Sequence, residues 1–233
     1  MEAASLFRAI ASRNWSMTSR LLAEAPLLAR HAITVGASRE SANEYFLEAI
    51  GHYVYAGDTP LHVAAAAYAT RIAKELVAKG ANPGARNRRG AEPLHYAADG
   101  SPGCDAWDPK AQYSIVEFLI EAGANPDARD KSGVAPLHRA VRTRCTSAVR
   151  ALLEHGADPV ARNRSGSTPL HLGVQNTGRG DSGSVASREE QRAIIRLLLS
   201  HGARASDKNA AGRSVRECVQ ADWVRTLLLG TVA

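Results

Sequence analysis

The sequence has few of the features that mark secreted, membrane-spanning or disulfide-stapled chains. Its 233 residues include only three cysteines, at positions with no zinc or disulfide spacing, which favours a reducing, intracellular setting. No apolar run approaches the length of a membrane span. The first residues contain Glu2, Arg8 and Arg13 and no apolar core, so we expect no secretory signal. These absences predict a cytoplasmic protein that does not associate with membranes.

Combinations of residues that carry catalysis are also scarce. The carboxylates are scattered, with no paired acid and base. Cys145 lies between Arg144 and Thr146, and adjacent cations can lower the pKa of a thiol. A nucleophile also needs a base within hydrogen-bond reach, and the nearest histidine, His138, belongs to the start of the preceding helix. We therefore expect a buried Cys145, no cofactor and no metal, while an enzymatic site near Trp107 stays an open alternative.

The sequence is rich in internal repetition. Four segments share the pattern Gly-x-x-Pro-Leu-His: GDTPLHVAA, GAEPLHYAA, GVAPLHRAV and GSTPLHLGV, which begin at Gly57, Gly90, Gly133 and Gly166. A second block follows each of them in step, as in LVAKGANPGARN and LLEHGADPVARN. The first and second segments are 33 residues apart, and so are the third and fourth. The chain is therefore built from a repeated unit.

Each unit has the signals of two helices. Thr59 and Thr168 are expected N-caps. Proline takes the first helical position, where its missing N–H costs nothing, at Pro60, Pro93, Pro136 and Pro169. Glycine is expected to end the second helices, at Gly80, Gly123, Gly156 and Gly202. Ser187 begins a predicted capping box, SREE, for the last of these helices.

These motifs and their period resemble ankyrin repeats, of the bacterial type. The resemblance implies an all-α solenoid of stacked helix-turn-helix units with short β-hairpin connections. The predicted segments are an N-terminal capping segment, four full repeats and a C-terminal capping repeat: 1–56, 57–89, 90–132, 133–165, 166–211 and 212–233. The resemblance also implies a structural hydrogen-bonding role for the recurring histidines, His62, His95, His138 and His171.

Two of the repeats are longer than 33 residues. The spacing is 43 residues from Gly90 to Gly133 and 46 from Gly166 to Gly212. Both insertions come between the two helices, so we expect two loops that flank the short turn of the repeat between them. This edge should gather Cys104, Asp105, Trp107, Asp108, Arg142, Arg144, Cys145, Asn176 and Arg179. Trp107 either packs against its own loop or is exposed to a partner.

In ankyrin proteins the concave groove formed by the first helices is the usual partner surface. Tyr96, Arg139 and Gln175 are the expected centre of that surface, because tyrosine and arginine concentrate interface energy. Asp99 could pair with Arg139 or Arg142 without a partner. The predicted partner-binding residues are Tyr96, Asp99, Trp107, Asp108, Arg139, Arg142, Arg144, Gln175, Asn176 and Arg179.

Three functions follow from these residues. The leading one is the non-catalytic binding of a protein or peptide of acidic character by a monomer, since the net charge is +6. The alternative is a small anionic ligand or substrate held by Arg142, Arg144 and Arg179. A weaker one is nucleic acid along a basic column of the hairpins, which has no interleaved aromatics for base stacking: Arg86, Arg129, Arg162 and Lys208.

Overall fold

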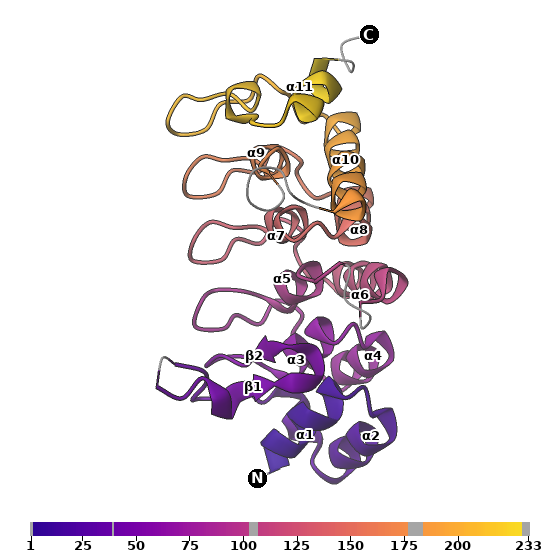
Figure 1. Cartoon of the computed structure of the whole chain (residues 1–233). Coiled ribbons are helices and arrows are strands. Elements are labelled where there is room, and N and C mark those ends of the chain that lie inside the picture. The colour runs from indigo at the N-terminus through magenta and orange to yellow at the C-terminus, as the bar shows by residue number, and fades with distance from the viewer. Residues whose placement is uncertain (1, 39, 103–106, 177–183, 230–233) are drawn as a thin grey trace.

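Helix pairs stack on one another along a single axis from the N-terminus to the C-terminus (Figure 1). The computed structural model describes residues 2–38, 40–102, 107–176 and 184–229. The predicted fold, a stack of helix pairs, is confirmed. Strands within the described residues are confined to one antiparallel pair, β1 (Phe46–Leu47) and β2 (His52–Tyr53).

The helices alternate between an inner row and an outer row. The first helices of the pairs are α1 (Glu2–Ala11), α3 (Pro60–Ala66), α5 (Pro93–Ala98), α7 (Pro136–Arg142) and α9 (Pro169–Gly173). The second helices are α2 (Trp15–Glu24), α4 (Thr70–Ala78), α6 (Pro109–Glu121), α8 (Thr146–Glu154) and α10 (Val185–Ser200). The stack ends with α11 (Asp222–Leu229). Short 3-10 turns are η1 (Pro26–Arg30), η2 (Asn43–Tyr45), η3 (Glu48–Ile50) and η5 (Arg216–Cys218).

The recurring histidines begin the first helices and join each pair to the next. His62 Nδ1 accepts the backbone N–H of Thr59 at 3.1 Å, so Nε2 carries the proton and donates to the carbonyl of Ala91 at 3.1 Å. The same two bonds recur in each of the three remaining units, where Nε2 donates to the carbonyls of Val134, Ser167 and Arg213. The predicted structural role of these histidines is confirmed.

The core is a continuous column of leucine and isoleucine between the two rows. The leucine after each helix-starting proline is fully buried: Leu61, Leu94, Leu137 and Leu170. Facing residues of the second helices, such as Leu76, Leu119, Leu152 and Leu198, are equally buried. Positive φ angles of 87° at Gly80 and 85° at Gly156 end the second helices, as predicted. No described helix is long and apolar enough to cross a membrane.

The insertions partly lengthen the second helices. α6 and α10 have 13 and 16 residues, against 9 in both α4 and α8. The side chain of Asp108 caps α6, and that of Ser184 caps α10 by accepting the N–H of Ser187. The prediction that Ser187 starts this helix is therefore wrong, because Ser184 provides the same capping oxygen three residues earlier.

A segment before α3 departs from the simple stack. Residues 31–56 include η2, η3 and the β1–β2 hairpin, in which Phe46 pairs with Tyr53 and Leu47 with His52. The hairpin reaches past α3 to the following unit, since the ring of His52 lies 4.5 Å from the ring of Tyr96 in α5. The sequence indicated only a connection here, whereas the structure shows a hairpin packed against the inner row.

Candidate functional site

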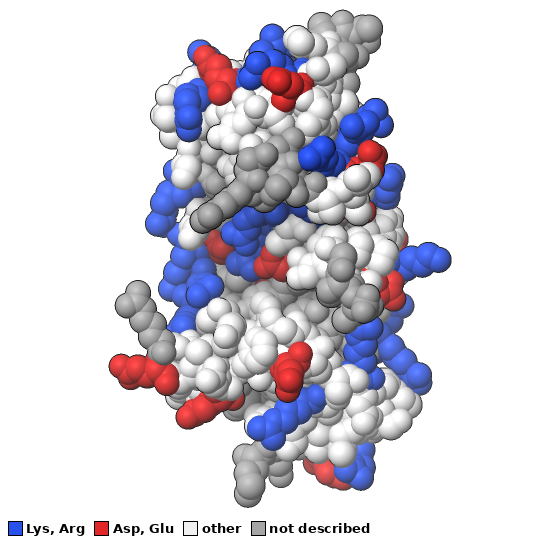
Figure 2. Space-filling model, in the orientation of Figure 1, with Lys and Arg blue, Asp and Glu red and all other residues white. Residues whose placement is uncertain are grey.

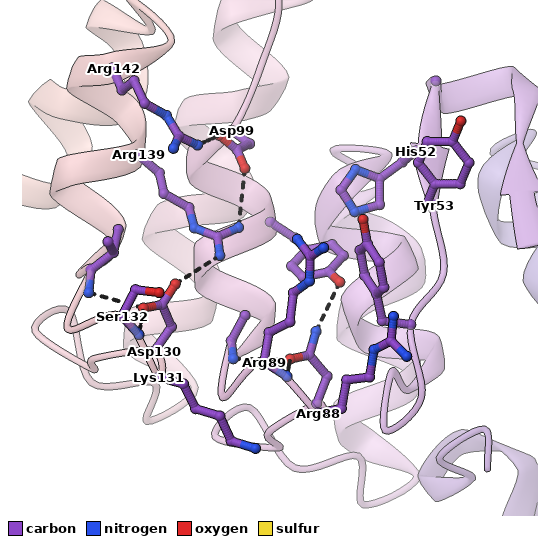
Figure 3. A pocket seen from close by; sticks show the side chains of 16 residues that line it. His52, Tyr53, Arg88, Arg89, Asp99, Asp130, Lys131, Ser132, Arg139 and Arg142 are labelled. Carbon is purple, nitrogen blue, oxygen red and sulfur yellow. Dashed lines mark hydrogen bonds and ion pairs between the residues drawn. The ribbon is translucent and has the colours of Figure 1, made fainter. Parts of the chain in front are cut away.

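A groove of about 660 Å³ opens between the β1–β2 hairpin, the turns that precede α5 and α7, and the inner helices themselves (Figure 3). We call it the basic groove and define it by six of its lining residues: His52, Tyr53, Arg88, Lys131, Arg139 and Arg142. Four of the predicted residues line it: Tyr96, Asp99, Arg139 and Arg142. The turns supply Arg88 and Lys131, which were not among the predicted partner-binding residues.

The charge of the basic groove is strongly positive. Among the described residues five cations line it, Arg88, Arg89, Lys131, Arg139 and Arg142, against two carboxylates, so the lining has a net charge of +3. Figure 2 shows that Lys and Arg side chains also gather along the edge where the turns between units project. A groove with this imbalance attracts anionic groups.

Arg139 is held at the centre of the groove by two ion pairs. Its guanidinium lies 3.2 Å from Asp99 and 3.2 Å from Asp130, and its side chain is 13% exposed. Arg142 lies 3.9 Å from Asp99 and is 62% exposed. The predicted pairing of Asp99 with these arginines is thus confirmed. Because both carboxylates are engaged with Arg139, Arg142 keeps most of its surface for another anion.

Asp130 is an anchored anion. Its carboxylate accepts the backbone N–H groups of Ser132 and Val134 as well as the bond from Arg139. Burial works to raise the pKa of Asp130, but these hydrogen bonds outweigh it and hold that pKa below its usual value. Asp130 therefore remains charged and keeps Arg139 in place.

Tyr96 lines the floor of the groove but is almost entirely buried. Its side chain is 3% exposed, its hydroxyl donates to Asp58 Oδ2 at 2.9 Å, and Asn87 Nδ2 donates to both Tyr96 and Asp58 at 2.9 Å. Burial and the neighbouring Asp58 carboxylate raise the pKa of Tyr96, so the phenol stays protonated. The prediction that Tyr96 lies on the inner face is correct, but its hydroxyl forms hydrogen bonds inside the protein and does not point to the surface.

The β1–β2 hairpin contributes aromatic side chains to the site, and the repeat pattern of the sequence does not predict them. Phe46 and Tyr53 stack with ring centroids 4.8 Å apart and are 40% and 37% exposed. His52 stands between this pair and Tyr96. The sequence does contain a sign of this aromatic cluster, because four of the chain's twelve aromatic residues fall between positions 45 and 55.

A second cleft, of about 1100 Å³, adjoins the basic groove. We call it the Trp107 cleft and define it by Ala49, Ile50, Ala66, Tyr68, Trp107 and Asp108. Trp107 Nε1 donates to Gln112 Oε1 at 3.1 Å, while the side chain is half-buried and lines the cleft. Trp107 is therefore anchored to α6 by its ring nitrogen and still borders open space.

Two buried glutamines that the sequence analysis missed hold the starts of the insertions. Gln112 Nε2 donates to the carbonyls of Ala97 and Asp99 at 3.1 and 3.2 Å. Gln191 makes the equivalent bonds to Gly173 and Gln175, at 2.7 and 2.8 Å. The signal lies in the alignment, because the two shorter units have alanine and cysteine at this position, Ala69 and Cys145.

Gln112→Ala should lower the free energy of unfolding by about 2 kcal/mol, because the carbonyl of Ala97 and the Trp107 N–H lose the partner that Gln112 provides. Urea unfolding measures the loss, and the emission of Trp107 should shift to the red as the indole is released. Gln175→Ala, at an exposed side chain, is the control and should change stability by less than about 0.5 kcal/mol. An unchanged Gln112→Ala protein would contradict the anchoring role.

The remaining predicted residues lie along the insertion edge. Arg144 donates to the carbonyls of Leu172, Gly173 and Gln175 at the end of α9, so the expectation that it is available to a partner is corrected. Asn176 bonds Gln220 at 3.0 Å and Gln175 is exposed. Cys104, Asp105 and Arg179 lie outside the described residues.

Cys145 is unsuited to nucleophilic chemistry. Its side chain is fully buried, and burial raises the pKa of the thiol to about 11. The expectation of a small buried residue is confirmed. His138, the nearest histidine in the sequence, uses both ring nitrogens at the start of α7.

One described group of side chains has the composition to hold a divalent cation. His155, at the end of α8, lies with Nε2 3.8 Å from Glu117 of α6, and the ligand atoms of His155, Glu117 and Glu121 lie within 4.8 Å of one another. His155 Nδ1 bonds the carbonyl of Ala151 at 2.9 Å, which directs Nε2 towards the carboxylates. In the structure this contact links the two outer helices.

The basic column of the hairpins is partly engaged within the chain. Arg86 lies 3.0 Å from Glu92, Arg162 donates to the carbonyls of Gly166 and Lys208, and Arg164 donates to that of Lys131. Two of the four column residues, Arg86 and Arg162, are engaged in this way, and the bonds to the carbonyls of Lys208 and Lys131 join neighbouring turns. This observation weakens the nucleic-acid alternative.

Comparison with protein families agrees with this architecture. Residues 105–209 match the model for ankyrin repeats in three copies, and residues 56–88 match the model for a single ankyrin repeat. No curated protein matches the chain. The matches cover the short units, the second long unit and the later part of the first, and they leave residues 89–104 and the β1–β2 hairpin outside.

Proposed function

The chain belongs to the ankyrin-repeat family, whose repeats are generally protein-binding modules, and from that premise we propose that the basic groove binds an acidic segment of a partner protein. The chain acts as a monomer in this proposal, and the groove supplies both charge and aromatic surface. Catalysis forms no part of it.

The observation that carries the proposal is the unbalanced charge of the groove. Its two carboxylates both contact Arg139, so the surplus of +3 falls on side chains at the rim, chiefly Arg142 and Lys131. Both of these are exposed. An acidic segment supplies the missing counter-charge, and complementary potentials favour its encounter and its alignment.

The rim adds surface that suits a polypeptide. The exposed Tyr53 lines the groove and packs against the exposed Phe46, and exposed aromatics next to arginine are enriched at protein interfaces. Further along the stack, Gln175 and Asn176 extend the proposed surface beyond α7. Tyr96 supports the surface from below through its bond to Asp58.

The small-ligand alternative has less support. It requires Arg142, Arg144 and Arg179 to converge, but Arg144 already caps the end of α9 with its guanidinium. Of the three, Arg142 is the one whose side chain the structure shows to be largely exposed. A groove of about 660 Å³ that continues into a second cleft also suits a segment of chain better than a compact anion.

Arg142→Glu should weaken the binding of a fluorescent, glutamate-rich peptide about tenfold, because it replaces attraction at the rim with repulsion. Fluorescence anisotropy measures the affinity, and added salt should weaken it further. Arg196→Glu makes the same change of net charge on exposed α10, outside the groove, and should leave the affinity within about twofold.

Equal losses in the two variants would show that net charge, and not the groove, attracts the peptide. Failure of the native chain to bind any acidic peptide would overturn the proposal. Light scattering of the same samples checks that the bound species contains one copy of the chain.

A further inference from the structure

The Trp107 cleft and the basic groove are two halves of one depression. Four residues line both of them, Gly51, His52, Tyr96 and Asp99. His52 and Tyr96 pack ring against ring at 4.5 Å and form the low partition between the halves. A polypeptide that lies in the basic groove therefore reaches the Trp107 cleft by crossing His52.

The two halves differ in charge. The Trp107 cleft is bordered by one cation, Arg13, and by three carboxylates, Glu48, Asp99 and Asp108, among the residues that the structure describes. Its lining has a net charge of −2, against +3 in the basic groove. The Arg13 side chain is moreover hydrogen-bonded within the protein, because its Nε donates to the carbonyl of Ala67 at 2.7 Å. An acidic segment that fits the basic groove is repelled at this point.

The Trp107 cleft offers apolar surface in place of cations. Ala49, Ile50 and Ala66 line it from two sides. The polar atoms of Trp107 and Tyr68 bond within the protein, Trp107 Nε1 to Gln112 and the Tyr68 hydroxyl to the carbonyl of Asp99 at 2.6 Å. What Tyr68 and Trp107 contribute to the cleft is therefore mainly ring carbon, held in place before any ligand arrives.

We infer that the Trp107 cleft binds apolar side chains of the same partner segment whose acidic residues occupy the basic groove. The recognised segment is then bipartite: a run of Asp or Glu that ends at His52, followed or preceded by large apolar residues. This inference rests on the proposed function, and it adds a second recognition element that discriminates among acidic segments.

Three kinds of peptide, which share one acidic run and differ only in their two terminal residues, test the inference by fluorescence anisotropy. One kind ends in two leucines, one in two serines and one in two aspartates, and each is made with the ending at either terminus. The better leucine peptide should bind about tenfold tighter than the serine peptide, because burial of leucine removes apolar surface from water. The aspartate peptide should bind most weakly of the three.

A variant of the cleft locates the effect. Ala49→Glu adds a charge at an exposed position of η3 that lines the cleft, so the fold should be kept. It should abolish the preference for leucine and leave the affinity for the serine peptide within about twofold. Ala23→Glu, on exposed α2, is the matched control and should keep the tenfold preference.

The outcomes separate the two proposals. Equal affinity of leucine and serine peptides, or a preference that survives Ala49→Glu, would overturn the bipartite segment while acidic binding stands. If no acidic peptide binds, whatever its ending, the proposed function fails as well. A preference lost in Ala49→Glu and kept in Ala23→Glu supports the inference.

Discussion

Asp58→Ala should lower the free energy of unfolding by about 4 kcal/mol, since one buried carboxylate serves three donors. Asp58 is fully buried and accepts the backbone N–H of Tyr55 at 2.6 Å, Asn87 Nδ2 at 2.9 Å and the hydroxyl of Tyr96 at 2.9 Å. Alanine leaves all three donors without this acceptor in a site from which water is excluded, and each costs about 1–3 kcal/mol.

Urea unfolding measures this loss, and two other variants calibrate it. Tyr96→Phe removes one donor and keeps the carboxylate, so it should cost about 1 kcal/mol. Asp222→Ala, at a carboxylate whose side chain is 95% exposed, should cost close to nothing. A loss below about 1 kcal/mol in Asp58→Ala would show that the network does not hold the hairpin side of the groove together.

Acidification should destabilise the protein well before its carboxylates titrate. Burial, reinforced by the nearby Arg139 guanidinium, lowers the pKa of His95 to about 4 from the ordinary value of 6.5. Above pH 6.5 the imidazole is neutral in both the folded and the unfolded chain, and its full contribution is present. Between pH 6.5 and about 4 only the unfolded chain takes up the proton, so the free energy of unfolding falls as the pH falls.

The expected loss from His95 alone is about 3 kcal/mol over this range. Burial also lowers the pKa values of the three equivalent histidines, which adds to the loss in the same direction: His62, His138 and His171. Urea unfolding between about pH 7 and pH 5 measures the slope. His95→Gln should be less stable than the native chain at neutral pH. Its free energy of unfolding should depend less steeply on pH, by about 1 kcal/mol per pH unit. An identical slope would contradict the buried neutral imidazole.

The stacked fold was predictable from the sequence because each unit repeats the same local signals. Proline at the first helical position, leucine after it and glycine at the end of the second helix are read within a few residues, and they fix both helices. The histidine bonds were also implied by the resemblance. The start of α10 was misplaced, because Ser184 and Ser187 offer equivalent caps and the sequence alone does not rank them.

The candidate site was predictable only in outline. The repeat register puts four residues on one face: Tyr96, Asp99, Arg139 and Arg142. How deeply each side chain is buried depends on the element that covers that face. The covering element, the β1–β2 hairpin, has no copy in the other units and so no register to read. The bonds of Gln112 and the ion pairs of Arg139 join positions up to 40 residues apart, which no local pattern specifies.

The histidine bonds have a consequence for how such a chain changes over evolutionary time. Each imidazole meets a main-chain carbonyl, and the four residues that present it, Ala91, Val134, Ser167 and Arg213, share no side-chain chemistry. The hydrogen bond between neighbouring units therefore does not depend on which side chain the accepting residue carries. A duplicated or deleted unit meets the same acceptor as before, so gene rearrangements can alter the number of units without inventing a new interface.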